Sequence, residues 1–279
     1  MPAKKPAQST STLALGQTPK YNWRPDKPDA RDHIFEKLNT ISATLPPSID
    51  LRSHCPPVLD QGQIGSCTGN AIAGIVEYYD NTHNKAGVIV SRLFIYYQER
   101  VLEGTTYYDA GAYIRDGIKA CNQYGAPLET VWPYLSNKVT TRPSTAAYTD
   151  AAKRKVGSYQ RITTQAAGIK ASLNSGYPVV VGFTVYASFE TGTWWQPTGT
   201  GQMPYPNVNT EQILGGHAVA IVGYNDAMTG SGGQTGYFIV RNSWGTGWGQ
   251  SGYFYMPYSV INNANMSSDF WSVNSVTNP

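Results

Sequence analysis

Apolar and polar positions follow a helical period in the first part of the chain and a strand period in the second. A helix at about 66–80 is predicted by five apolar residues at helical spacing, Ala71, Ile72, Ile75, Val76 and Tyr79. Ser66 is a residue type that favours the N-cap, so we expect it to cap this helix. The segments 91–104 and 110–125 have helical patterns that end at glycine, and 165–176 has a shorter one.

Strand patterns dominate the last hundred residues. Four segments rich in β-branched and aromatic residues are predicted as strands: 178–185, 217–225, 236–244 and 252–258. A glycine-rich stretch, 230–236, joins the second and third of them; it lacks the Gly-Lys-Ser/Thr of a phosphate loop, so we expect a hairpin loop. Helices followed by strands predict an α+β protein, and the cleft between two such halves is a usual place for chemistry.

The first 46 residues differ from the rest of the chain and are rich in Pro, Lys, Ser and Asp. Pro25 and Pro28 favour extended backbone here, so we expect an N-terminal arm (residues 1–46) that lies on the body. Its apolar anchors would be Tyr21, Trp23, Ile34 and Phe35. The arm could resemble a propeptide and restrain activity, or it could pack elsewhere and cover apolar surface. The body is predicted to divide into a mainly helical part, 47–164, and a mainly β part, 165–279.

Composition narrows the class of protein. The 279 residues are 41% hydrophobic and 14% charged with a net charge of +3, which argues against intrinsic disorder. The basic triplet 153–155 is expected to be a solvated surface patch, so we expect no nucleic acid partner. No run of 18 apolar residues occurs, and the N-terminus lacks the apolar core of a secretory signal. We therefore expect a protein with no membrane segment that is either cytoplasmic or exported by a route that does not use such a signal. We also expect a monomer.

Cys67 stands out among three cysteines because it follows Gly65-Ser66 at the expected start of a helix. A helix N-terminus stabilises a thiolate, which is the reactive form of cysteine. The odd number of cysteines does not indicate a disulfide framework. A pair between Cys55 and Cys121 is possible if Cys67 is the reactive thiol, and the sequence leaves this open.

A nucleophilic cysteine needs a base, a group that orients the base, and a donor for the oxyanion. His217 follows two glycines and begins an apolar strand, and Asn242 ends the next strand, so the amide could orient the imidazole. Trp244 could cover that hydrogen bond. Gln61, six residues before Cys67, could join the Cys67 backbone N–H in holding the oxyanion. Each of these residues alone would more often be structural.

Three sequence blocks together resemble the signatures of the papain-like cysteine peptidases: QGQIGSC (61–67), GGHAVAIVGY (215–224) and YFIVRNSWGTGWGQSGYF (237–254). The resemblance implies a two-lobed fold, with a helical lobe, an antiparallel β-barrel-like lobe and the active-site cleft between them. It also implies a cysteine endopeptidase that acts on peptide or protein substrates through a thiolate–imidazolium pair. No metal or other cofactor is implied.

The resemblance also implies residues that bind substrate. Gly65 and Ser66 adjoin the nucleophile, Gly111 is expected beside the bound peptide backbone, and Trp244 beside the histidine. Gly215 and Gly216 stand where larger or acidic residues are frequent, which implies a wider pocket for the second residue before the cleaved bond.

The chain departs from the family pattern at several places. Thr68 replaces a frequent tryptophan, Ile64 stands where many members have a disulfide cysteine, and no standard long propeptide precedes the body. Segments 91–100 and 111–118 look closer to bacterial members than to plant or lysosomal ones. Two rival functions remain: a Cys-His amidase or acyl transferase, and an inactive binding protein on a peptidase scaffold.

Overall fold

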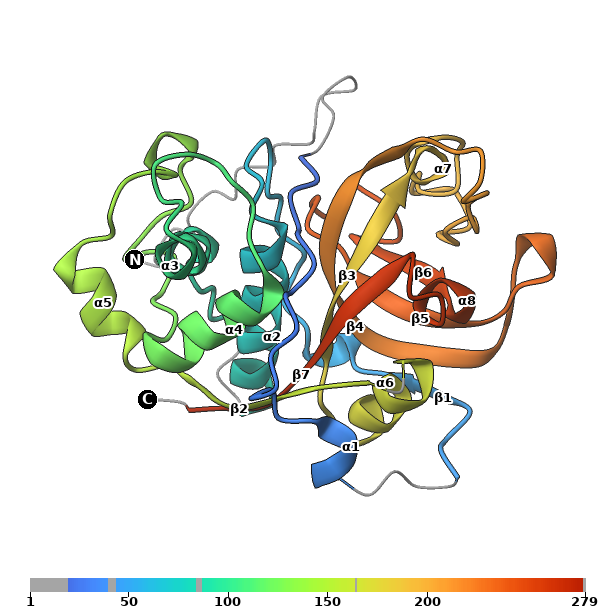
Figure 1. Ribbon diagram of the computed structural model, residues 1–279, viewed down its shortest axis with the longest axis horizontal. Helices are drawn as coiled ribbons and strands as arrows, with labels where there is room; N and C mark the ends of the chain where they lie inside the picture. Colours follow the sequence, from blue (N-terminus) through green and yellow to red (C-terminus); the bar gives the residue numbers. More distant parts are fainter. Residues whose placement is uncertain (1–19, 40–43, 84–86, 164, 278–279) are drawn as a thin grey trace, which may run out of the picture.

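The computed structural model describes residues 20–39, 44–83, 87–163 and 165–277, which form two lobes with an extended segment between them (Figure 1). Its helices are α1 (Phe35–Leu38), α2 (Cys67–Thr82), α3 (Arg92–Glu103), α4 (Ile114–Gln123), α5 (Thr145–Ala151), α6 (Gln165–Asn174), α7 (Ala187–Glu190) and α8 (Tyr258–Ile261). Its strands are β1 (Ser48–Asp50), β2 (Val156–Arg161), β3 (Val179–Tyr186), β4 (Ile213–Thr229), β5 (Thr235–Arg241), β6 (Tyr253–Pro257) and β7 (Ser267–Val276). The α+β prediction is confirmed.

The helical lobe is built from α2, α3 and α4, as their apolar periodicity predicts. In α3, the Ser91 hydroxyl accepts from the Phe94 N–H at 3.1 Å, and Gly104 ends the helix in left-handed backbone. Ser66 directly precedes α2 as predicted, but the prediction that its side chain caps the helix is wrong, because that side chain accepts no helix N–H. Its hydroxyl lies 2.6 Å from the hydroxyl of Tyr134 and accepts from the Asn70 amide.

The strands of the described chain form one antiparallel sheet in the order β2-β7-β3-β4-β5-β6, and β1 pairs with β4. The four predicted strands are confirmed as β3 to β6. The end strands β2 and β6 are not paired with each other, so the sheet is open and does not close into a barrel. Strands β1, β2 and β7 had no clear signal in the sequence, because they are short or rich in polar residues.

Helix α2 joins the two lobes. Its buried face, including Ile72 and Val76, belongs to one apolar cluster with Val180, Ala220 and Trp271 of the sheet. The Tyr79 hydroxyl also donates to the Val273 carbonyl of β7 at 2.6 Å. These contacts hold the middle and the C-terminal end of α2 against the sheet, and they thereby fix the direction of the helix that begins at Cys67.

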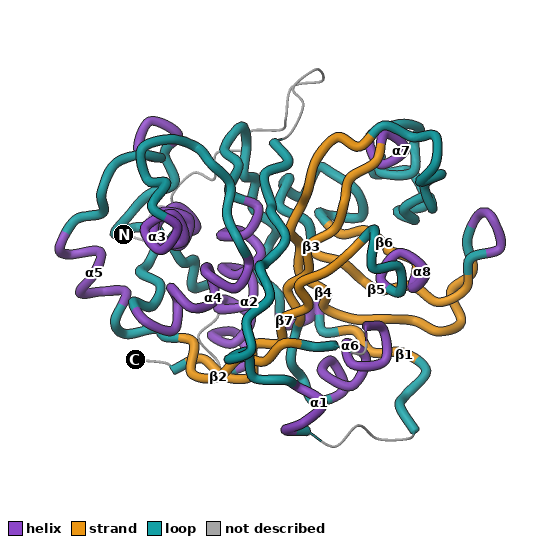
Figure 2. The backbone as a smooth tube through the Cα atoms, viewed as in Figure 1, coloured by secondary structure: helices purple, strands orange, loops and turns teal. Residues whose placement is uncertain are grey.

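The N-terminal arm runs between the lobes as an extended chain, and Figure 2 shows it as the loop that passes in front of α2 and β7. The Trp23 N–H donates to the Gly216 carbonyl at 2.9 Å, and the Arg24 N–H donates to the Ala112 carbonyl at 3.2 Å. Of its four predicted anchors, Trp23 and Phe35 are buried, and Tyr21 and Ile34 are partly buried. The part of the prediction on residues 1–19 and 40–43 lies outside the described residues.

A buried cluster of charged residues holds the part of the arm that follows Trp23, at Asp26 and Asp32. The Asp26 N–H donates to Asp269 at 2.7 Å, and its carboxyl accepts from the Arg115 N–H and the Trp271 indole. Arg161 contacts both Asp32 of the arm and Asp269 of β7.

All three cysteines are free thiols. The possible pair between Cys55 and Cys121 is not formed. Cys121 is buried in α4, and the Cys55 thiol donates to the Leu51 carbonyl at 3.7 Å.

Arg241, the last residue of β5, ties the sheet to the segment that leads to Cys67. Its guanidinium donates to the carbonyls of Pro56 and Pro57 at 2.6 and 3.0 Å, and it lies against Gly74 of α2. Because residue 242 follows directly, these contacts also fix the end of β5 near α2.

We expect Arg241→Met to lower the free energy of unfolding by about 3 kcal/mol, because two buried carbonyls lose their donors and the lobes lose a connection. Arg52→Met is the matched control, since Arg52 is 35% exposed and pairs with Asp50. It should cost less than about 1 kcal/mol. Urea unfolding followed by tryptophan fluorescence measures both, and equal losses would contradict this role for Arg241.

Candidate active site

Cys67 is the first residue of α2 and is fully buried. The backbone N–H groups of Ala218, Asn22 and Thr68 lie near its sulfur and lower the thiol pKa, which favours the thiolate. Burial outweighs them and raises the pKa of the Cys67 thiol to about 11, with a smaller contribution from the Glu99 carboxyl. The sulfur therefore lies between the helix N-terminus, strand β4 and the arm.

His217 lies on β4 next to Ala218, opposite Phe183 of β3. Its Nε2 donates to the side-chain oxygen of Asn242 at 2.8 Å. Because that nitrogen carries the proton, Nδ1 of a neutral ring has a free lone pair, and it has no hydrogen-bond partner among the described residues. Burial lowers the pKa of His217 to about 4, although the bond to Asn242 raises it.

Aromatic rings enclose the imidazole. Trp244 stacks on it with ring centroids 5.1 Å apart, and Phe183 and Tyr21 each meet it edge-on at 5.8 Å. Tyr21 belongs to the arm, so the arm forms part of the apolar surroundings of His217. With these pKa shifts, a neutral thiol and a neutral imidazole are the favoured forms at pH 7 while the arm is in place.

Gln61 is buried, and its side-chain oxygen, side-chain nitrogen and backbone carbonyl each have a hydrogen-bond partner. Its side-chain oxygen accepts from the Ser243 hydroxyl at 2.5 Å, and its side-chain nitrogen donates to the Ile64 carbonyl at 3.0 Å. Its carbonyl accepts from the Tyr134 hydroxyl at 2.8 Å. These contacts hold the amide in one orientation. Sequence reasoning did not find Ser243 or Tyr134 as supports, although Ser243 directly follows Asn242.

Gly65 lies against the arm, because a Cβ at this position would lie 2.2 Å from the side-chain nitrogen of Asn22. The Gly65 N–H donates to the Asp109 carboxylate, which also accepts from Lys20 of the arm at 2.8 Å and from the Tyr96 hydroxyl at 2.6 Å. The Ser66 hydroxyl is bonded inside the protein. Asp109 was not predicted, because no motif or periodicity marks it.

The remaining predicted glycines line the path of the arm. We define the arm site as the two walls with which the arm pairs, 111–112 in the helical lobe and 215–216 in the sheet lobe. A Cβ at Gly111 would lie 1.9 Å from the Asn22 carbonyl oxygen, and one at Gly215 would lie 2.6 Å from Tyr21. The arm therefore passes directly over the residues predicted to bind substrate.

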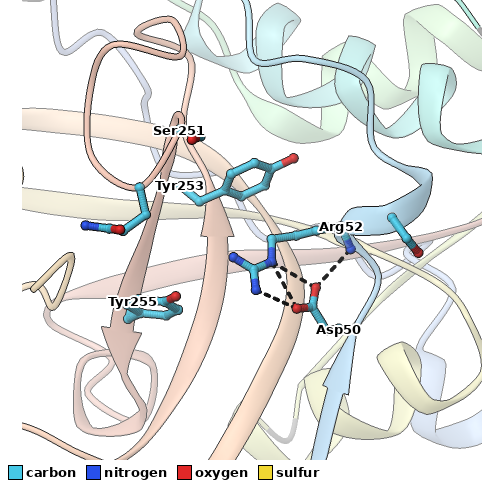
Figure 3. Close-up of a pocket in the computed structure, with 7 residues that line it drawn as sticks. Asp50, Arg52, Ser251, Tyr253 and Tyr255 are labelled. Atoms are coloured by element: carbon cyan, nitrogen blue, oxygen red, sulfur yellow. Dashed lines mark hydrogen bonds and ion pairs between the residues drawn. The ribbon is translucent and has the colours of Figure 1, made fainter. Parts of the chain in front are cut away.

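A shallow depression lies between β1 and β6 (Figure 3). Tyr253 and Tyr255 flank Arg52, whose guanidinium is bonded to Asp50. None of its lining residues was predicted to act in catalysis or substrate binding.

Two searches limited to the described residues gave negative results. No group of three or more histidine, cysteine or acidic side chains is arranged to bind a metal ion. No helix in that part of the chain has the length and apolarity that a membrane crossing requires.

The chain is similar to a set of known proteases. The model of the papain family cysteine proteases matches residues 45–273. A peptidase C1-like protein of Acanthamoeba polyphaga mimivirus is 40% identical over 97% of this chain and 90% of its own length. The crystal structure of xylellain, a cysteine protease from Xylella fastidiosa, superposes with a TM-score of 0.79 at 36% identity, over 91% of this chain and 96% of that one. Cathepsin B-like CP3 of Giardia intestinalis is 29% identical over 80% of this chain and 73% of its own length.

We expect iodoacetamide to alkylate Cys67 in the full chain at pH 8 about a hundredfold more slowly than in the chain unfolded in guanidinium. The reason is that burial raises the thiol pKa from about 8.5 to about 11, and only the thiolate reacts. The rate, followed by mass spectrometry of the Cys67 peptide, should rise steadily up to pH 10. A plateau below pH 9 would contradict the buried, neutral thiol.

Proposed function

The chain belongs to the papain family of cysteine proteases and is a cysteine peptidase, and we propose that it cleaves peptide bonds through a thioester on Cys67. The observation that supports this most is the bond between Nε2 of His217 and Asn242, which leaves Nδ1 as the basic nitrogen. The backbone N–H of Ala218, the residue after His217, lies near the Cys67 sulfur, which supports the pairing of this histidine with the thiol.

In the proposed reaction, Nδ1 of His217 takes the thiol proton and the Cys67 sulfur attacks the carbonyl carbon of the scissile bond. The oxyanion is held by the Cys67 N–H and by the second N–H of the Gln61 amide. The imidazolium then gives its proton to the leaving amine. Water, deprotonated by His217, hydrolyses the thioester and restores the thiol.

We propose that the N-terminal arm restrains this activity. The backbone N–H of Asn22 in the arm lies near the sulfur, and an N–H offers no carbon for attack. It also uses the Gly216 carbonyl, and it contributes Tyr21 to the enclosure of His217. These contacts keep substrate and water away from Cys67 and His217 and favour the neutral form of both residues.

The restraint should depend on pH. Burial and the facing charge of Asp269 raise the pKa of Asp26 to about 7 in the docked arm. A carboxyl whose pKa is raised on docking stabilises the docked state below its ordinary pKa near 4, and this stabilisation is lost as pH rises through 7. Arg115 and Arg161 lie close to these carboxyls, but both also pair with Asp32. Their positive charge therefore does not fully offset the repulsion between the carboxylates of Asp26 and Asp269.

We expect Cys67→Ala to abolish hydrolysis of casein and of peptidyl-coumarin substrates, with a loss of at least about a thousandfold in kcat. Cys55→Ala is the control and should keep wild-type activity, since Cys55 is not among the proposed catalytic residues. Hydrolysis of small amides without casein would favour an amidase. A folded wild type with no activity on either, even with the arm displaced, would indicate a binding protein.

Trp23→Ala in the full chain should raise kcat/KM for a peptide substrate at pH 6 by at least tenfold, because the arm loses a buried indole worth about 3 kcal/mol. Arg31→Ala is the matched control within the arm, since that side chain is 84% exposed and forms its ion pair with Asp29, which also belongs to the arm. The advantage of the variant should shrink at pH 8. Equal rates for wild type and Trp23→Ala at both pH values would reject the restraint.

A further inference from the structure

Three groups of the helical lobe hold the side chain of Arg24 in the arm. Its guanidinium forms an ion pair with the carboxylate of Glu103, the last residue of α3, and donates to the Gly111 carbonyl at 3.4 Å. It also lies over the ring of Tyr113, with Cζ 4.4 Å from the ring centroid. We define the arginine cage as the Glu103 carboxylate, the Gly111 carbonyl and the Tyr113 ring.

The helical lobe fixes this cage by its own contacts. The Tyr113 N–H donates to Oε1 of Glu103 at 2.9 Å, so one residue both orients the carboxylate and supplies the aromatic face. The other carboxylate oxygen, Oε2, accepts from the guanidinium of Arg24. An ion pair combined with stacking on a ring suits a planar guanidinium better than the compact ammonium of lysine.

The electrostatics of the cage favour a bound cation. The Glu103 side chain is 4% exposed, and burial raises its pKa to about 7, with a further contribution from Asp116 and an opposing one from Arg24. Without that arginine, an ionised Glu103 would be a buried charge with no partner cation in the arm, which is unfavourable. The Arg24 side chain is 37% exposed, so the cage is open to the surface and can admit a guanidinium from another peptide.

The cage adjoins the backbone path of the arm. The Arg24 N–H donates to the carbonyl of Ala112, the residue between Gly111 and Tyr113. Asn22, two residues earlier in the arm, has its N–H near the Cys67 sulfur. A peptide that replaces the arm and pairs with Ala112 would therefore carry one of its side chains to the cage, within a few residues of the bond at the sulfur.

We propose that the arginine cage is a specificity site of this peptidase, and that it selects peptides with an arginine side chain at one fixed spacing from the cleaved bond. This inference rests on the proposed function. Glu103 recognises the positive charge, and Tyr113 distinguishes the planar guanidinium from an ammonium. The arm occupies the cage with an arginine of its own, so the same contacts would serve restraint and selection.

The experiment uses the full chain with Trp23→Ala/Arg24→Ala, so that the arm lacks both its indole and its guanidinium. Short neutral peptides carry one arginine that is moved through successive positions, and mass spectrometry of the products locates each cut at pH 8, above the pKa of Glu103. The cut should move with the arginine at a constant spacing. At the best position, kcat/KM for arginine should exceed that for citrulline, which is uncharged and of similar shape, at least about tenfold. It should exceed that for lysine at least about threefold.

Two further substitutions in this protein separate charge from shape. Glu103→Gln should remove the preference for arginine over citrulline, and Tyr113→Leu should remove the preference for arginine over lysine while the preference for charge remains. Glu129→Gln is the matched control and should change neither, since that carboxylate of the helical lobe pairs with Arg92 of α3. A cut that ignores the position of the arginine, equal kcat/KM for arginine and citrulline, or a preference that survives Glu103→Gln would overturn the proposal. If Glu103→Gln does not fold, the Tyr113→Leu result decides.

A second measurement is independent of catalysis. Cys67→Ala is added to the same protein, and fluorescence anisotropy follows the binding of the best arginine peptide and of its citrulline counterpart. Binding that is at least about tenfold weaker with citrulline supports the cage, and equal binding or none rejects it. If the arginine peptide binds in this way but the protein with Cys67 cleaves no peptide, the proposed function fails and the cage stands. If all peptides are cleaved alike, the cage fails and the proposed function stands.

Discussion

The site depends on one contact: the first turn of α2 meets strand β4 beside Cys67. The N–H groups of Thr68, in the helical lobe, and Ala218, in the sheet lobe, both lie near this sulfur and lower the thiol pKa, and Ala218 is the neighbour of His217. Every other part of the site is arranged around this junction. Arg241 and Tyr79 hold α2 and the sheet together at a distance from the sulfur. Asn242 and Gln61 then set the orientation of groups that the junction has brought close.

The arm changes the electrostatics of this junction. Sequence reasoning predicted an ionised thiol at a helix tip; with the arm in place, burial raises the pKa of Cys67 and lowers that of His217, which favours the neutral form of each. The helix N-terminus still contributes in the expected direction, and the loss of solvent outweighs it. No local pattern around Cys67 could reveal this, because the covering residues lie more than forty positions earlier in the chain.

The sequence predicted those parts of the fold in which apolar residues recur with a clear period. Helices α2, α3 and α4 and strands β3 to β6 have such patterns. Strand β7 does not, because two of its buried positions are serines, Ser267 and Ser272, whose hydroxyls are hydrogen-bonded. The Ser272 hydroxyl lies 2.7 Å from that of Ser172. The resemblance of three sequence blocks to the papain-like signatures predicted Cys67, His217, Asn242 and Gln61 as one group. Asp109 and Tyr134 have no such signal, since their roles come from tertiary contacts alone.

The arm and the site it covers belong to one polypeptide. The fraction of molecules whose site is covered by the arm is thus set by an intramolecular equilibrium. In such an equilibrium a linked segment has an effective concentration in about the millimolar range. Dilution of the protein leaves that equilibrium unchanged, unlike inhibition by a separate molecule. A single cleavage of the connecting chain would convert this equilibrium into a bimolecular association. At low protein concentration the cleaved segment would then dissociate from the site.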